Sequence, residues 1–211
     1  MENLHNLYEA ILTGKLELAV STTQEAIEKG VKPQEIINGY MIKAMEEIGN
    51  RYEAGKAFVP ELLMAARAMK GSLDLLRPLL KADSISGTAK VAIGTVKGDL
   101  HDIGKNLVAS MLEGCGFEVM NLGVNVSADQ FINAVKNDGA KVICMSALLT
   151  TTMNQMKEVI EACKTAGIRE HVKIMVGGAP VNQSFADSIG ADGYSDNANS
   201  AVALAKSLVG A

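Results

Sequence analysis

Apolar residues in the N-terminal part of the chain recur at the three- and four-residue spacing of amphipathic helices. Leu4, Leu7 and Ile11 form the first of these rows, and Pro60 lies where the first turn of a later helix tolerates proline. Brief connections separate the rows, so residues 1–81 predict a small bundle of four helices. In the other three helices, the residues expected to face inward are Leu18, Ala19, Thr22, Ala26 and Ile27, then Ile37, Met41, Ala44 and Ile48, and last Leu62, Leu63, Ala66, Met69, Leu73 and Leu76.

From Lys90 onward, short β-branched apolar runs alternate with amphipathic segments of helical spacing. Five βα units of this kind predict a five-stranded parallel sheet with helices on both faces. Right-handed crossovers make this a doubly wound α/β fold of flavodoxin-like or Rossmann-like type. A small, polar run over 82–89 indicates a linker between domains at 1–81 and 90–211. The expected strands are 90–95, 117–121, 141–146, 172–177 and 192–194, and the expected helices are 104–115, 128–138, 153–166, 181–189 and 198–208.

The composition narrows the classes of partner. The net charge is −4, whereas binding to nucleic acid needs clustered Lys and Arg. No apolar run approaches the roughly 18 residues that cross a bilayer, and the residues after Met1 lack the pattern of a signal peptide. Cys115, Cys144 and Cys163 form no C-x-x-C pair and are expected to be reduced thiols of a cytoplasmic protein. We therefore expect no nucleic-acid partner and no membrane partner.

A candidate site follows the first expected strand. Asp99, His101 and Gly104 come directly after an apolar run, and open α/β sheets bind ligands at the carboxyl ends of their strands. A histidine can give one ring nitrogen to a metal and the other to a carboxylate, which fixes the tautomer and strengthens the ligand. Because an isolated histidine is more often a surface or capping residue, this loop alone does not establish a site.

Two further loops are expected at the same edge of the sheet. The loop after the third strand carries Ser146 and the run Thr150–Thr152, whose hydroxyls donate or accept hydrogen bonds. After the fourth strand, Gly177 and Gly178 lack a Cβ atom and let a ligand approach the backbone. A glycine pair alone is more often a turn, and a threonine run is more often a helix cap. Their occurrence after strands of one sheet predicts a site for a large, partly polar ligand.

Together the three loops carry a set of residues found in a known family. The set resembles the signature of the cobalamin-binding domain: Asp99-x-His101-x-x-Gly104, then Ser146-x-Leu148, then Gly177-Gly178. The stretch Phe58–Met69 resembles the cap helix of cobalamin-dependent methionine synthase. Nearly the whole chain is similar to the stand-alone corrinoid proteins of methylamine and methanol methyltransferase systems. This resemblance implies a helical cap domain, then a cobalamin-binding α/β domain, with cobalamin or a related corrinoid as cofactor.

The resemblance also implies a role for individual residues. His101 would replace the cofactor's own base as the lower ligand of cobalt, and Asp99 would accept the hydrogen of the other ring nitrogen. Thr152, where methionine synthase carries serine, would complete a relay to solvent. Phe58 would shield the upper face of the corrin, with the core of the bundle as the alternative place for this residue. The residues implied to contact the corrinoid are Asp99, His101, Asp102, Ile103, Gly104, Ser146, Leu148, Thr150, Thr152, Gly177, Gly178, Tyr194 and Phe58.

The function implied by this resemblance is that of a methyl carrier. The chain would carry a methyl group on cobalt from a substrate-specific methyltransferase to a second methyltransferase, which delivers it to tetrahydrofolate or a thiol. A reductive activation protein would restore oxidised cobalt. No nucleophile with a matched base is visible, so we expect a non-catalytic subunit. A corrinoid sensor, the small subunit of a cobalamin-dependent mutase and a receiver-like regulatory domain remain alternatives. The sequence shows no basic segment of the kind with which a sensor reads DNA, and its helical N-terminal half counts against a mutase subunit. His101 has no role in a receiver-like domain.

Overall fold

The structure of the protein is a computed structural model that describes residues 2–79 and 89–210. These residues form two compact units, one built from the N-terminal helices with Glu113–Gly116 and one from the rest of the C-terminal part. The linker expected at 82–89 lies outside the described residues except for its last position. Among the helices that the structure describes, none is long and apolar enough to cross a bilayer.

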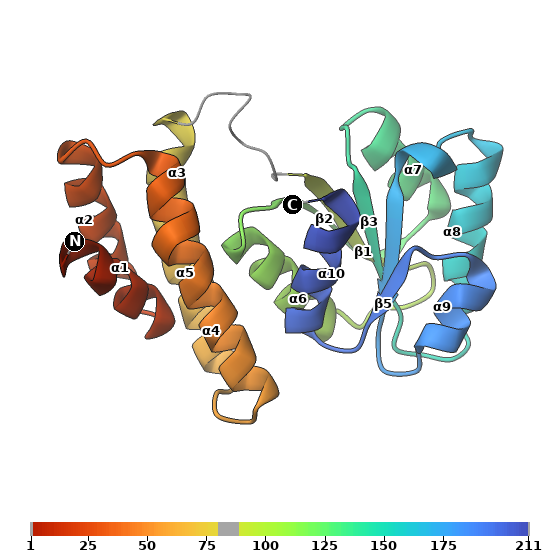
Figure 1. Cartoon of the computed structure of the whole chain (residues 1–211). Helices are drawn as coiled ribbons and strands as arrows, with labels where there is room; N and C mark the ends of the chain where they lie inside the picture. The colour runs from red at the N-terminus through yellow and green to blue at the C-terminus, as the bar shows by residue number, and fades with distance from the viewer. Residues whose placement is uncertain (1, 80–88, 211) are drawn as a thin grey trace. The chain divides into compact units, whose positions relative to one another are not determined.

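The N-terminal unit consists of four helical rods (Figure 1). The third rod is composite, because a turn of π-helix joins two α-helical segments without a break. It extends to Glu53, past the end predicted near Gly49, since a glycine inside a helix costs only about 1 kcal/mol relative to alanine. The bounds are α1 Glu2–Leu12, α2 Leu16–Glu28, α3 Pro33–Ile36, η1 Ile37–Met41, α4 Ile42–Glu53, α5 Val59–Leu76 and η2 Arg77–Leu79.

Two leucines of this unit do not face inward as predicted. Leu18 and Leu63 are 45% and 39% exposed. The buried stripe of α2 runs from Ala19 to Ala26, one position round the helix from Leu18, and in α5 the neighbouring Leu62 is fully buried. The buried stripe of α2 consists of small residues, whereas that of α5 also contains three leucines and a methionine. Helices α2 and α5 pack against each other, and this packing decides which residues are buried.

The C-terminal unit is a five-stranded parallel sheet with the strand order β2-β1-β3-β4-β5. This flavodoxin-like order confirms the predicted doubly wound fold. Helices α7, α8 and α9 cover one face of the sheet, and α6 and α10 cover the other (Figure 1). The bounds are β1 Lys90–Val96, α6 Ile103–Gly114, β2 Glu118–Val126, α7 Ala128–Lys136, β3 Val142–Ser146, α8 Asn154–Thr165, η3 Arg169–His171, β4 Lys173–Gly177, α9 Gln183–Ile189, β5 Gly193–Ser195 and α10 Ala198–Val209.

Strand β2 is longer than predicted and continues to Val126. Its pairing with β1 shifts register on both sides of Gly94, so the second half of β2 is bulged. Gly123 and Asn125, with φ values of 85° and 54°, lie in this irregular stretch. Residues of this kind are typical of turns, which is why the sequence pattern ends the strand too early.

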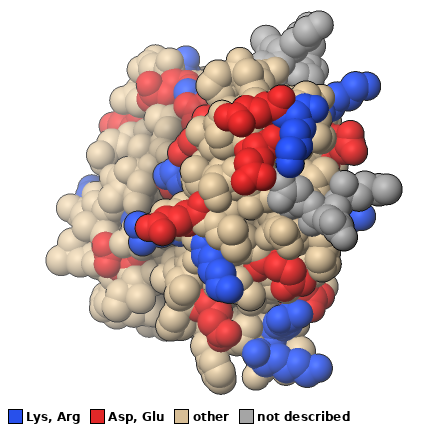
Figure 2. Space-filling model, turned by 90° about the vertical axis from the view of Figure 1, so that its left-hand side faces the viewer, with Lys and Arg blue, Asp and Glu red and all other residues tan. Residues whose placement is uncertain are grey.

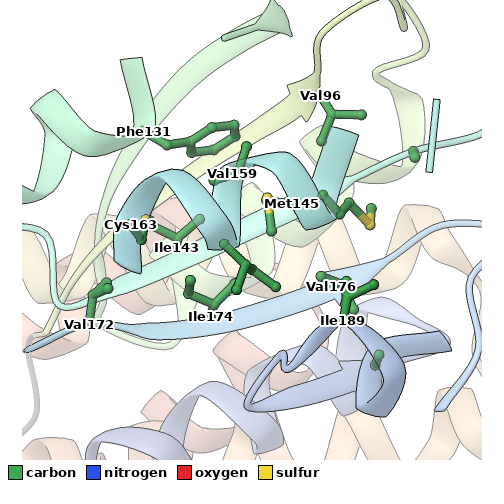
Figure 3. Close-up of a cluster of buried hydrophobic side chains, with 14 of the residues drawn as sticks. Val96, Phe131, Ile143, Met145, Val159, Cys163, Val172, Ile174, Val176 and Ile189 are labelled. Atoms are coloured by element: carbon green, nitrogen blue, oxygen red, sulfur yellow. The ribbon is translucent and has the colours of Figure 1, made fainter. Parts of the chain in front are cut away.

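Aliphatic side chains form the core on the face covered by α7, α8 and α9. Figure 3 shows Phe131 of α7 and Val159 of α8 packed with strand residues such as Ile143. The burial of this layer fixes the sheet on which the loops at its carboxyl edge are built. On the face of the molecule in Figure 2, basic and acidic side chains both occur, separated by uncharged residues.

The two adjacent leucines of α5 provide a test of this packing. We expect Leu62→Ala to lower the free energy of unfolding by about 2–5 kcal/mol, because a fully buried side chain leaves a cavity. Leu63→Ala makes the same chemical change on the exposed side and should stay within about 1 kcal/mol of the unmodified protein. Urea titration of the ligand-free full chain measures both. Equal losses would contradict the assigned faces of α5.

Candidate functional site

The loop after β1 brings Asp99 and His101 to the carboxyl edge of the sheet. The strand ends at Val96, whose carbonyl oxygen accepts a hydrogen bond from the Asp99 amide at 3.1 Å. Gly98 has a φ of +81°, which suits glycine in the turn that this bond closes. Since β1 lies between β2 and β3, this loop is at the point where the strand order reverses. Doubly wound sheets bind their ligands at this point.

The buried carboxylate of Asp99 joins this loop to the loop after β3. Its Oδ1 accepts a hydrogen bond from the His101 amide at 3.0 Å and lies 2.8 Å from Nδ1 of the same residue. Its Oδ2 accepts from the Leu148 amide at 2.8 Å and the Leu149 amide at 3.3 Å. The hydroxyl of Thr152 donates to Oδ2 at 2.8 Å. The structure therefore brings together Asp99, His101 and Thr152, the three residues for which the resemblance implies a relay.

These contacts determine the charge of Asp99. Burial raises the pKa of the carboxyl group, but hydrogen bonds from the amides of Leu148 and His101, the His101 ring and the Thr152 hydroxyl outweigh it. The net result is a pKa well below the usual range of aspartate. Asp99 is therefore ionised near neutral pH, although its side chain is inaccessible to solvent.

His101 is held at one ring nitrogen and exposed at the other end. Because an ionised carboxylate only accepts hydrogen bonds, the neutral ring carries its proton on Nδ1, next to Asp99. The side chain is 51% exposed, and the lone pair of a neutral Nε2 is available to a ligand. The Thr95 hydroxyl of β1 donates to the carbonyl oxygen of His101 at 2.9 Å and thereby restrains the backbone of His101.

A bare metal ion would not find a complete ligand set here. Among the residues that the structure describes, no group of three or more His, Cys, Asp or Glu side chains could hold an ion. His101 alone offers one oriented nitrogen donor. A single donor suits a metal that an organic macrocycle already holds and that needs one axial ligand from the protein.

The glycines of the site differ in what surrounds them. A Cβ atom on Gly178 would lie 1.9 Å from the Ala147 carbonyl oxygen, and one on Gly177 would lie 3.0 Å from the Ser195 carbonyl oxygen. Both positions are filled by the protein's own backbone. A Cβ atom on Gly104 would meet no atom within 4 Å, so this position is open. Ser146 pairs with Gly177 at the ends of β3 and β4.

Large apolar side chains are exposed in the loops around His101. Ile103 is 87% exposed and Leu100 is 70% exposed, both in the segment that contains the histidine. Leu148 and Leu149 of the loop after β3 are also exposed. The resemblance identified Ile103 and Leu148 but gave no signal for the other two. Exposed apolar residues at a ligand-binding edge indicate that the ligand is itself partly apolar.

Four other predicted residues make none of these hydrogen bonds to Asp99. Tyr194 of β5 is partly buried and packs against the core of the sheet. Phe58 precedes the first turn of α5 and is 68% exposed, so the alternative that places it in the bundle core is wrong. Thr150 is exposed, whereas Asp102 accepts a hydrogen bond from the Asn106 amide group at 2.9 Å.

Sequence reasoning missed two polar anchors of this edge, Lys105 and Asn125. Lys105 is buried, and its Nζ donates to Asn106 and, at 2.7 Å, to the Asn121 side chain of β2. Burial lowers the pKa of its amine, against the opposing charge of Asp102. Asn125 bonds the loop that carries Asp99. Lysine in the first turn of a helix and asparagine near a strand end usually indicate solvent exposure, so neither gave a signal.

Comparisons with known proteins identify this arrangement. Two family models, each described as a B12 binding domain, match residues 4–77 and 89–203. The chain is 43% identical over 210 residues to dimethylamine corrinoid protein 1 of Methanosarcina acetivorans, with 99% of this chain and 98% of the relative covered. It is 43% identical over 203 residues to the trimethylamine corrinoid protein of Methanosarcina barkeri, with 95% and 94% covered.

Solved structures give the same result. A chain of the methanol:cobalamin methyltransferase complex MtaBC from Methanosarcina barkeri matches with a TM-score of 0.84 and 30% identity, over 99% of this chain and 80% of that chain. A cobalamin-binding protein from Desulfitobacterium hafniense DCB-2 matches with a TM-score of 0.82 and 30% identity, over 97% and 98%.

These matches confirm the predicted family and its cofactor class. The relatives are named as corrinoid proteins, in agreement with the carrier interpretation and not with a sensor, a mutase subunit or a receiver domain. The chain belongs to the family of corrinoid proteins, which hold cobalamin or a related corrinoid and have a B12 binding domain after an N-terminal helical domain.

Proposed function

We propose that the chain carries a methyl group on a corrinoid whose cobalt ion is bound from below by His101. The observation that carries the proposal is the His101 imidazole, held at Nδ1 by a buried carboxylate and half exposed at the carboxyl edge of the sheet. When bound, the corrinoid supplies a cobalt ion that accepts a methyl group from one protein partner and gives it to another. The protein contributes binding, orientation and control of protons.

The residues present fit such a group. The exposed side chains of Leu100, Ile103 and Leu148 provide an apolar surface beside the histidine. The open space at Gly104 lets a ligand approach the first turn of α6. The set that we propose for the slot of the displaced nucleotide tail and its surroundings is Asp102, Gly104, Ser146, Thr150, Gly177, Gly178 and Tyr194.

Asp99 and Thr152 would control the proton of His101. The ionised carboxylate keeps one proton on Nδ1 and leaves Nε2 as the ligand atom. The same carboxylate would also stabilise a proton on Nε2 of a His101 ring that holds no metal. The Thr152 hydroxyl lies within hydrogen-bond distance of both Asp99 Oδ2 and the Leu149 carbonyl oxygen, so it can donate to either. Asp99 and Thr152 would thus hold the proton of the His101 ring in place while the ring holds the corrinoid.

The N-terminal unit would act as the cap of the upper face. Phe58, Val59 and Met64 at the start of α5 are exposed apolar side chains of this unit and could shield a reactive methyl group from water. We assign the cap domain to 1–81, the linker to 82–89 and the corrinoid-binding domain to 90–211.

The partners follow from this role. The relatives' names and the methanol:cobalamin methyltransferase complex support a substrate-specific methyltransferase that loads the cobalt with methyl groups from an amine or an alcohol. A second methyltransferase would pass the group to tetrahydrofolate or a thiol, and a reductive activation protein would restore oxidised cobalt. A cytoplasmic location suits both acceptors and the reduced metal.

Replacement of the histidine tests the proposal directly. The protein loaded with hydroxocobalamin and reduced to cobalt(II) should show hyperfine coupling to one histidine nitrogen, which changes on ¹⁵N-histidine labelling. His101→Ala should lose this coupling because the variant removes the imidazole that binds the cobalt ion. His171→Ala, which removes an exposed histidine from the opposite edge of the sheet, should keep it. Retained coupling in His101→Ala, or a protein that binds no cobalamin, would refute the proposal.

The carboxylate should affect how strongly cobalt is held. Because Asp99 orients the ligand, we expect Asp99→Asn to weaken metal binding or methyl transfer by about 10–100-fold. Asp138→Asn makes the same change at an exposed position after α7 and serves as the matched control. Titration with hydroxocobalamin measures the affinity. Equal affinities for both variants would remove Asp99 from the site.

The same carboxylate should make stability depend on pH in the ligand-free protein. Its pKa is lower in the folded state than the roughly 3.9 of unfolded chains, so the stability it contributes is full above about pH 4. That stability is lost as the pH falls toward the folded-state pKa. Between about pH 4 and pH 2, the unmodified protein should therefore lose stability more steeply than Asp99→Asn. Parallel curves from urea titrations over this range would contradict the lowered pKa.

A further inference from the structure

One residue outside the family motif holds the loop of Asp99 and His101 at two adjacent positions. The backbone N–H of Asn125 donates to the Asp99 carbonyl oxygen at 3.0 Å. The Oδ1 atom of Asn125 accepts a hydrogen bond from the Gly98 amide at 2.8 Å. A single residue at the end of β2 therefore bonds the turn that leads into the site.

The backbone at Asn125 is built for this contact. Among the described residues it is the only non-glycine residue with a positive φ, which is 54°. Asparagine adopts this left-handed conformation more readily than most residues. The local register shift between β1 and β2 removes Asn125 from the regular ladder and frees its N–H for the loop. Bulges of this kind re-aim groups toward functional sites.

The contact adds a restraint at Gly98, the one position of the turn before Asp99 that has no side chain. Gly98, with its φ of +81°, has no side chain to restrict the turn. The Asp99 carboxylate begins one residue later and reaches the His101 ring at 2.8 Å. An unrestrained turn at Gly98 would let the carboxylate, and with it the ring, move away from the amides of the loop after β3.

We propose that Asn125 is a positioning residue of the corrinoid site, which fixes the turn at Gly98 and Asp99 and thereby the place of the His101 imidazole. This inference rests on the proposed function in so far as His101 is the ligand of cobalt. Asn125 itself does not touch the metal. Its effect passes through the Asp99 backbone to the carboxylate and then to Nδ1 of the ring.

Three variants distinguish the effect of the Asn125 side chain from that of the Asn125 backbone. Asn125→Gly accepts the positive φ and keeps the N–H but removes the Oδ1 acceptor. Because Asn125 is exposed, the variant leaves the core intact. Asn125→Asp keeps an acceptor and tolerates the left-handed conformation, so it should restore the contact. Asn137→Gly makes the same substitution at the C-terminal end of α7, at the opposite edge of the sheet, and is the matched control.

The first measurement uses the ligand-free protein. We follow hydrogen exchange at the amides of His101 and Leu148, which bond the Asp99 carboxylate and not Asn125. Loss of one hydrogen bond should speed exchange at both amides about fivefold in Asn125→Gly. The second measurement uses the hydroxocobalamin-loaded protein reduced to cobalt(II). The ratio of histidine-bound to histidine-free cobalt should fall about fivefold in the same variant.

Each outcome decides the inference. Faster exchange and a lower ratio in Asn125→Gly, with Asn125→Asp and Asn137→Gly close to the unmodified protein, support it. Unchanged exchange at His101 and Leu148 overturns it, as does an unchanged ratio with faster exchange. If the unmodified protein takes up no cobalamin, the proposed function fails, and the exchange measurement alone shows whether Asn125 positions the pair of Asp99 and His101.

Discussion

The contact between the loops after β1 and β3 depends on one buried charge. Burial of a carboxylate costs several kcal/mol unless hydrogen bonds replace the lost water. Asp99 receives those bonds from its own loop and from Leu148, Leu149 and Thr152 of the loop after β3. The charge is therefore stable only when both loops are in place. The interaction that makes the burial tolerable also holds the ring of His101.

The sheet topology explains why these two loops meet. Strands β1 and β3 are neighbours, yet the chain leaves them toward opposite faces, since α6 and α8 cover different sides of the sheet (Figure 1). Because β1 and β3 are neighbours, their loops begin side by side at the carboxyl edge, where the Asp99 carboxylate joins them. The third neighbour, β2, contributes through its irregular end, where Asn125 reaches the turn after β1. The regular pairing of β1 with β2 from Lys90 to Ile93 thus supports the irregular backbone at the carboxyl ends of these strands.

Much of this arrangement could be predicted from the sequence, because the features concerned are local. The alternation of apolar runs predicts the strands, and the spacing of Asp99 and His101 on one short loop predicts their contact. The exposure of Leu63 could not be predicted, because it depends on which stripe packs against other helices. The role of Asn125 depends on the bulges of β2, and that of Lys105 on its contact with Asn121 of β2, and neither is a property of one segment.

The close approach at Gly178 has a consequence for redesign of the cofactor slot. Any side chain there would collide with the Ala147 carbonyl oxygen, and the N–H of the same peptide group, that of Leu148, donates to the Asp99 carboxylate. A substitution meant to admit a different corrinoid tail would therefore also disturb the electrostatics of the axial imidazole. Under the proposed role of Gly178 in the slot of the corrinoid tail, a change that selects another tail would also alter the surroundings of the His101 imidazole, and a designer would have to treat the two together.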